Sequence, residues 1–167
     1  MADYYTLFSF DLKLPNTEAV EYAMNVVSMV DRLASESDES RKSLKSEFPD
    51  ELLEFLDDWS FEVVKEESAI WIHSDYGGVD AACQFVQHLL DKFRITETIT
   101  FEWANTCSKP RLDAYGGGAV LITATDIKSM TTSEWIYQQL HRHPFNLALQ
   151  TGRSLGRSLL MNTYYPV

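Results

Sequence analysis

The first residues of the chain alternate between apolar and polar side chains, as a half-buried β-strand does. Over residues 4–14, Phe8, Phe10, Leu12 and Leu14 fall on one face, and serine, aspartate and lysine side chains fall on the other. The pattern predicts an opening strand that places one face on the core.

Four later segments carry apolar residues at helical spacing. They are residues 17–34, 49–59, 79–93 and 131–140. Pro49 suits the first turn of the second segment, and Thr131 with Glu134 forms a capping box at the start of the fourth. Residues 35–46 are rich in serine and mixed charges, so we expect a mobile connection there.

Strand patterns separate these helices. They cover residues 61–65, 69–73, 95–103 and 119–124. The first two read as a hairpin, and a long loop, residues 105–117, separates the last two. The order of elements predicts an α+β fold, in which an antiparallel sheet carries helices on one face. We expect a ferredoxin-like split β-α-β unit with an extra strand and a C-terminal helix.

The composition changes near residue 140. Residues 141–167 contain no acid, three arginines and a direct repeat of Gly-Arg-Ser-Leu. We therefore expect a single domain over residues 1–140, followed by a basic helix or tail over residues 141–167.

Negative charge is concentrated at the start of the chain. Residues 1–67 contain 17 acids and 6 bases, a balance of −11 that equals the net charge of the whole chain. Residues 47–67 form an acidic block with nine acids and one lysine. The acids are Glu47, Asp50, Glu51, Glu54, Asp57, Asp58, Glu62, Glu66 and Glu67.

A dense row of carboxylates can imitate the phosphates of a nucleic acid duplex, which carries about one charge per 1.7 Å of axis. These nine acids are therefore our predicted partner-binding residues, and the expected partner is a protein with a basic nucleic-acid-binding surface. The common alternative is a solvated acidic face that has no partner. The overall charge argues against direct binding of nucleic acid.

The loop before the last strand is a second candidate site. Lys109 and Arg111 supply positive charge, and the backbone N–H groups of Gly116, Gly117 and Gly118 could help to hold an anion. The glycines precede a strand and no Lys-Ser or Lys-Thr follows, so this is not a P-loop. They could equally serve only to let the chain turn or bulge into the strand.

Residues suited to catalysis are few. His73 and Asp75 end a strand, but no histidine or cysteine lies at metal-ligand spacing from them. Cys107 lacks an identifiable base, and Glu102 with Asp113 could form a carboxylate pair of unknown separation. We expect no catalytic residue, no metal and no cofactor.

Compartment is indicated by the cysteines and the apolar runs. Cys83 lies in a helical pattern and Cys107 in a polar loop, which predicts two free thiols and a reducing environment. The N-terminus lacks the features of a secretory signal, and no apolar run is long enough to cross a bilayer. We expect a cytoplasmic protein that does not bind membranes, and its oligomeric state is left open.

Residues 101–111, with Gly116, Gly117, Gly118 and Ala119, resemble a pattern in uncharacterised acidic proteins of phages and plasmids. The resemblance covers about residues 60–140. It implies a setting in which small acidic proteins inhibit host defences that act on nucleic acids, as anti-CRISPR and antirestriction proteins do.

Three functions follow from these observations. The leading hypothesis is a non-enzymatic acidic inhibitor, of DNA-mimic type, that binds a basic surface of a nucleic-acid-targeting complex. The first alternative is an adaptor or immunity-type interaction module that uses the loop at residues 105–118. The second is a small enzyme that uses Cys107 or His73.

Overall fold

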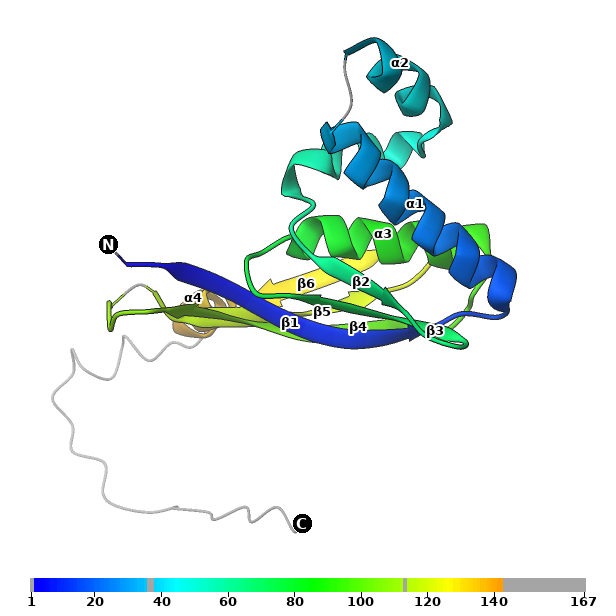
Figure 1. The fold of residues 1–167 in the computed structure, drawn as a ribbon. Coiled ribbons are helices and arrows are strands. Elements are labelled where there is room, and N and C mark those ends of the chain that lie inside the picture. The colour runs from blue at the N-terminus through cyan, green and yellow to red at the C-terminus, as the bar shows by residue number, and fades with distance from the viewer. Residues whose placement is uncertain (1, 36–37, 113, 143–167) are drawn as a thin grey trace, which may run out of the picture.

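The computed structural model describes residues 2–35, 38–112 and 114–142, and Figure 1 shows the fold. The elements in chain order are β1 (Tyr4–Lys13), α1 (Thr17–Ser35), α2 (Asp38–Glu47), η1 (Asp50–Asp58), β2 (Glu62–Lys65), β3 (Ala69–Ser74), α3 (Val79–Lys92), β4 (Ile99–Cys107), β5 (Gly116–Ile122), β6 (Ile127–Thr131) and α4 (Thr132–Arg142). Of these, η1 is a 3-10 helix.

The strands form one antiparallel sheet in the order β2-β3-β1-β4-β5-β6. Strand β3 lies between β1 and β2, and β1 lies between β3 and β4. The units β1-α1-β2 and β3-α3-β4 therefore each skip one strand, which is the split β-α-β arrangement of a ferredoxin-like sandwich. The expected α+β class and topology are confirmed, and two strands, β5 and β6, extend the sheet where the sequence predicted one.

Helices α1 and α3 cover one face of the sheet (Figure 1). Helix η1 packs on α3, and α2 lies beyond, farthest from the sheet. Among the described residues, the opposite face has no helix except α4, which contacts β5 and β6. We call this opposite side the open face.

The core lies between the sheet and these helices, as the alternation in β1 predicts. Phe8 and Leu12 are buried, and the ring of Phe10 stacks on that of Phe101 in β4, with centroids 4.3 Å apart and planes 5° apart. Burial of each such side chain contributes roughly 1.5–3 kcal/mol. The core thereby fixes which side chains face the helices and which face outward.

One expected connection is a helix. The prediction of a mobile connection over residues 35–46 is wrong for residues 38–46, because α2 spans Asp38–Glu47; residues 36–37 lie outside the described residues. Leu44, in its last turn, and Phe48, just after it, are both buried. Two apolar anchors are too few to produce a helical pattern, so the serine and charged residues around them led to the prediction of a connection instead of a helix.

The region around β5 also differs from expectation. Strand β4 continues to Cys107 and β5 begins at Gly116, so the loop is shorter than residues 105–117. Strand β6 was not predicted, because its five residues Ile-Lys-Ser-Met-Thr show little apolar alternation. Pairing with β5 on one side supplies the stability that its own sequence does not.

The capping box at the start of α4 is confirmed. The Thr131 backbone N–H donates to Glu134 Oε2 over 2.9 Å, and the Glu134 N–H donates to Thr131 Oγ1 over 3.1 Å. The helix continues to Arg142, so the expected domain boundary at residue 140 falls inside it. Residues 143–167 of the expected tail lie outside the described residues.

Gly117→Ala should lower the free energy of unfolding by roughly 2–4 kcal/mol, since strain and overpacking at a buried strand position carry costs of this order. Gly117 has φ +150°, and an added Cβ would lie 2.1 Å from the Trp103 carbonyl oxygen. Gly116→Ala is the matched control, because its nearest contact is Thr132 Oγ1 at 3.3 Å. Urea unfolding measures both, and equal losses would contradict the assignment.

Candidate protein-binding surface

Helix η1 carries the centre of the predicted acidic block. It begins after Pro49, which lacks the N–H that a helix start leaves unpaired. A 3-10 helix has three residues per turn, so residues three apart share a face. Leu52 is fully buried, and Leu53 and Leu56, which share another face, pack against the core. Two of the three faces therefore carry side chains that anchor η1.

The third face of η1 is entirely acidic. Glu51, Glu54 and Asp57 follow one another at intervals of three and are all exposed. At a rise of about 2.0 Å per residue they repeat every ~6 Å along the axis. In an α-helix, each step of three residues would rotate by about 60° and spread them around the surface. We call these three residues the acidic row.

Three more of the predicted acids flank the acidic row. Glu47 ends α2 and Asp50 begins η1, and both are exposed. Asp58 Oδ2 accepts a hydrogen bond from the Ala81 backbone N–H, over 3.4 Å, in the first turn of α3. That position suits a carboxylate, because the first turn of a helix has unpaired N–H groups.

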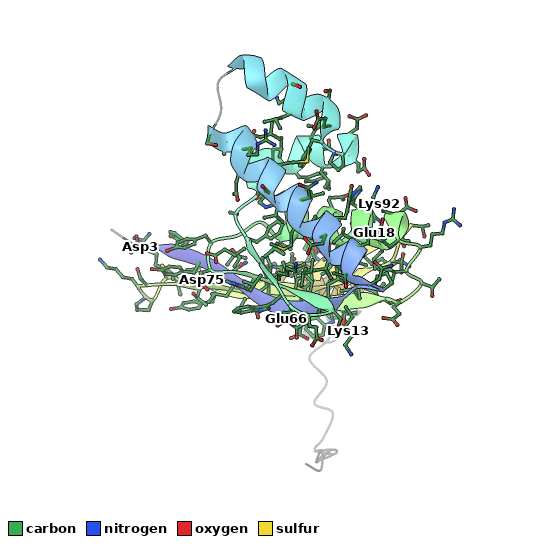
Figure 2. All side chains as sticks on the ribbon, turned by 45° about the vertical axis from the view of Figure 1, so that its right-hand side comes forward. Asp3, Lys13, Glu18, Glu66, Asp75 and Lys92 are labelled. Atoms are coloured by element: carbon green, nitrogen blue, oxygen red, sulfur yellow. The ribbon has the colours of Figure 1, made fainter. Side chains whose placement is uncertain are left out.

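The remaining three predicted acids lie apart from η1. Glu62 is on the open face, where its carboxylate oxygen is 3.8 Å from His73 Nε2. Glu66 and Glu67 occupy the turn between β2 and β3, and Figure 2 shows Glu66 at the level of the sheet near Lys13. The nine acids therefore do not form one continuous patch, although all nine are exposed.

The acidic row is only slightly neutralised. Among the described side chains, Asp50, Glu54 and Asp57 form no ion pair. The exception is Glu51, which contacts His88 and whose pKa is also lowered by the charge of Lys92. Lys65 of β2 pairs with Glu21, near the start of α1, rather than with the acidic row. Two carboxylates of the row, together with Asp50, are therefore available to a partner.

A buried histidine connects η1 to both core helices. His88 of α3 lies with Nε2 2.8 Å from the Tyr22 hydroxyl of α1 and Nδ1 2.6 Å from Glu51 Oε1. An ionised carboxylate only accepts, so Nδ1–H donates to Glu51, and in the neutral ring Nε2 accepts from Tyr22. In the sequence, His88 is one position of the helical pattern over residues 79–93 and was not predicted as a functional residue. Its signal was a histidine among buried apolar neighbours, where a polar side chain requires partners.

This arrangement holds the helices together better than it could serve catalysis. Burial, reinforced by the charge of Glu51, raises the pKa of Tyr22, so the phenol is a poor nucleophile. Lys92 Nζ lies 4.3 Å from the Tyr22 ring centroid and adds a cation–π contact. We call Tyr22, His88 and Glu51 the helix tie.

The other candidates for chemistry lie apart. His73 stacks on Trp71 with centroids 4.0 Å apart on the open face. Cys107 is half-buried and Cys83 is buried, and both are free thiols, as predicted. Burial, with a smaller effect of Asp80, raises the pKa of Cys83 to about 12, so this thiol is unreactive. Asp113 lies outside the described residues.

No set of three or more histidine, cysteine or acidic side chains in the described ranges could hold a metal ion. None of the helices within those ranges has an apolar stretch of the length needed to cross a membrane.

The predicted anion site has a different setting from the one expected. Gly116, Gly117 and Gly118 are strand residues that pair with β4 rather than loop residues. Trp103 explains two of them, because its backbone crowds Gly117 and its ring would meet a Cβ on Gly118 at 2.4 Å. Lys109 and Arg111 are exposed, and Arg111 Nη1 is 3.4 Å from the Tyr4 hydroxyl. Anion binding there stays a prediction.

Comparison with known proteins identifies no family. No protein-family model matches the chain, and no curated protein matches it. A solved structure that aligns with it is the apo form of LarC2, the C-terminal domain of a cyclometallase involved in the synthesis of the NPN cofactor of lactate racemase. The two are 14% identical over 90% of this chain and 94% of that chain, with a TM-score of 0.28. This TM-score is too low for any argument about function.

His88→Ala should lower the free energy of unfolding by roughly 2–4 kcal/mol, because it leaves a cavity and removes the hydrogen-bond partner of Tyr22. His73→Ala, on the open face, is the control and should cost less than about 1 kcal/mol. Urea unfolding of both variants measures this. A loss at His88 no larger than that at His73 would show that the helix tie contributes little.

Glu51→Gln tests the same contact through pH. Glu51's backbone N–H, then His88, hold the pKa of Glu51 below its ordinary value of 4.5. A carboxyl group whose pKa is lowered by folding contributes its full stabilisation above pH 4.5, the ordinary pKa of Glu51. This contribution disappears as pH falls through the lowered pKa of the folded state. The difference in unfolding free energy between parent and variant should shrink as pH falls below about 4.5. A constant difference through that range would contradict the assignment.

Proposed function

We propose that this chain is a non-enzymatic protein-binding module that docks its acidic row on a basic protein surface. The observation that carries the proposal is the alignment of Glu51, Glu54 and Asp57 on one exposed face of η1. Charge complementarity of this kind chiefly raises association rates and selects partners.

The setting of the acidic row favours binding. Its helix is anchored by Leu52 and by the helix tie, so the carboxylates are held in place before a partner arrives. Preorganisation reduces the entropy lost on binding. Asp50 and Glu47 extend the negative surface at the start of η1 and the end of α2.

The spacing of the row bears on the kind of partner. One carboxylate per ~6 Å is sparser than the charge of one duplex strand, which is about one per 3.4 Å of axis. The row therefore matches individual lysine and arginine side chains better than it copies a duplex. A surface that normally holds nucleic acid offers such side chains in quantity, and occupation of it would inhibit a nucleic-acid-targeting complex. The resemblance to acidic proteins of phages and plasmids supports this class of partner.

The loop between β4 and β5 supports the second candidate, an interaction module that uses this loop. Leu112 is fully exposed and Tyr115 is 58% exposed, beside the cations Lys109 and Arg111. Exposed apolar side chains within a loop are typical of recognition sites. Binding by this loop would tolerate charge changes in η1 and would depend on Leu112.

The test is charge reversal with a matched control. Glu54→Lys with Asp57→Lys should weaken binding to the co-purified partner at least about tenfold, and the parent complex should weaken steeply as salt rises. Glu66→Lys with Glu67→Lys makes the same change in net charge at the distant hairpin and should leave affinity within about threefold. Titration calorimetry at low and high ionic strength measures both pairs.

Two results would count against the proposal. Equal weakening by both pairs would mean that net charge alone matters. If the η1 pair left affinity unchanged and Leu112→Ala greatly reduced it, the binding surface would be the β4–β5 loop and not the acidic row.

A further inference from the structure

A cavity of about 370 Å³ lies beside the start of α3, on the helical side of the sheet. Residues of β1, β4 and β6 form its floor, and the end of η1 and the first turns of α3 form its other walls. Its volume falls within the range of small-ligand sites, about 300–1,000 Å³. We call this space the α3 cavity.

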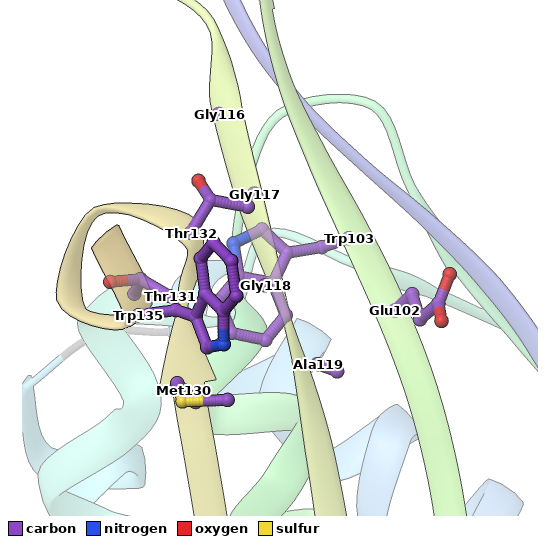
Figure 3. A pocket seen from close by; sticks show the side chains of 10 residues that line it. All are labelled: Glu102, Trp103, Gly116, Gly117, Gly118, Ala119, Met130, Thr131, Thr132 and Trp135. Atoms are coloured by element: carbon purple, nitrogen blue, oxygen red, sulfur yellow. The ribbon is translucent and has the colours of Figure 1, made fainter. Parts of the chain in front are cut away.

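An indole ring forms one wall of the α3 cavity. Trp103 of β4 lines it, two residues after the buried Phe101 on the same side of the sheet. The ring extends over Gly118 of β5, where an added Cβ would lie 2.4 Å from it (Figure 3). Because Gly118 has no side chain, the ring has room there. Val79 and Ile127 add further apolar surface to the lining.

The charged side chains of the lining are both acidic. Asp58 ends η1 and Asp80 lies in the first turn of α3, and the described residues that line the cavity include no lysine, arginine or histidine. The start of a helix carries about half a positive charge. The Ala81 N–H there donates to Asp58 Oδ2 over 3.4 Å. Two carboxylates outweigh this half charge, so the cavity favours a cation.

The uncharged acceptors and the indole favour a guanidinium over an ammonium. Asn105 Oδ1 accepts from Thr6 Oγ1 over 3.1 Å, and an amide oxygen has a second lone pair. A guanidinium has five N–H donors in one plane, whereas an ammonium has three and is more strongly hydrated. The flat guanidinium also stacks on an indole such as Trp103. The lining therefore suits an arginine side chain.

We infer that the α3 cavity receives an arginine side chain of the basic partner. This inference rests on the proposed function and names one anchor within that interface. Asp57, the last residue of the acidic row, directly precedes Asp58, which lines the cavity. A partner seated on Glu54 and Asp57 therefore lies next to the cavity. An arginine held in a pocket is typical of the few residues that dominate binding at an interface.

The test begins with two blocked tripeptides added to the full-length chain. One is acetyl-Gly-Arg-Gly-amide, and the other carries citrulline, which has nearly the same shape without the charge. The arginine peptide should shift the NMR signals of the Trp103 indole and of the Gly77 and Gly78 amides, which border the cavity. The citrulline peptide should bind at least about tenfold more weakly.

Variants of the lining test the same site. Asp80→Asn should weaken binding of both the arginine peptide and the partner at least about fivefold, because it removes a carboxylate of the lining. Asp91→Asn is the matched control, since it removes one charge at the other end of α3 and should leave both affinities within about twofold. Ser129→Lys directs an ammonium of the chain itself into the cavity and should abolish binding of the arginine peptide.

Three results would overturn the proposal. These are equal binding of the two peptides, equal effects of Asp80→Asn and Asp91→Asn on the partner complex, and binding of the arginine peptide that survives Ser129→Lys. All three leave the acidic row intact as the docking surface. Failure of the row itself is measured separately, by charge reversal at Glu54 and Asp57.

Discussion

The attachment of η1 to the two core helices is the constraint on which the rest of this account depends. Leu52 anchors η1 through apolar burial. His88 of α3 contacts both Tyr22 of α1 and Glu51 in the first turn of η1, and so connects the three helices. Without these contacts a nine-residue 3-10 helix would not persist, since such helices are rarely stable beyond a few residues. One residue, Glu51, belongs both to this attachment and to the acidic row. Stability and recognition are thereby joined at one carboxylate.

The two faces of the molecule are suited to different tasks. The helical side presents fixed carboxylates around Glu54 and Asp57, which act at long range and select by charge. The open face presents apolar side chains around Met130 and Trp135, which act only on contact and on exclusion of water. The sheet lies between these two surfaces.

Much of the fold is predictable from the sequence, because its signals are local. The alternation in β1, the helical repeats and the Thr131 capping box each belong to neighbouring residues, and their order yields the ferredoxin-like topology. The errors arise where stability comes from elsewhere in the chain. Helix α2 depends on burial of Leu44 and Phe48, and β6 depends on its pairing with β5.

The site was predicted only in part, for a similar reason. The acidic residues are evident from the composition, but their alignment depends on η1 being a 3-10 helix. No local sequence pattern predicted a 3-10 helix in place of an α-helix. The contacts of His88 with residues 37 and 66 positions away likewise cannot be seen in the sequence.

Mapping of amide chemical-shift changes when the partner is added tests the central claim most directly. The account predicts the largest changes at Glu54, Asp57 and their neighbours in η1, and changes confined to the β4–β5 loop or the open face would contradict it.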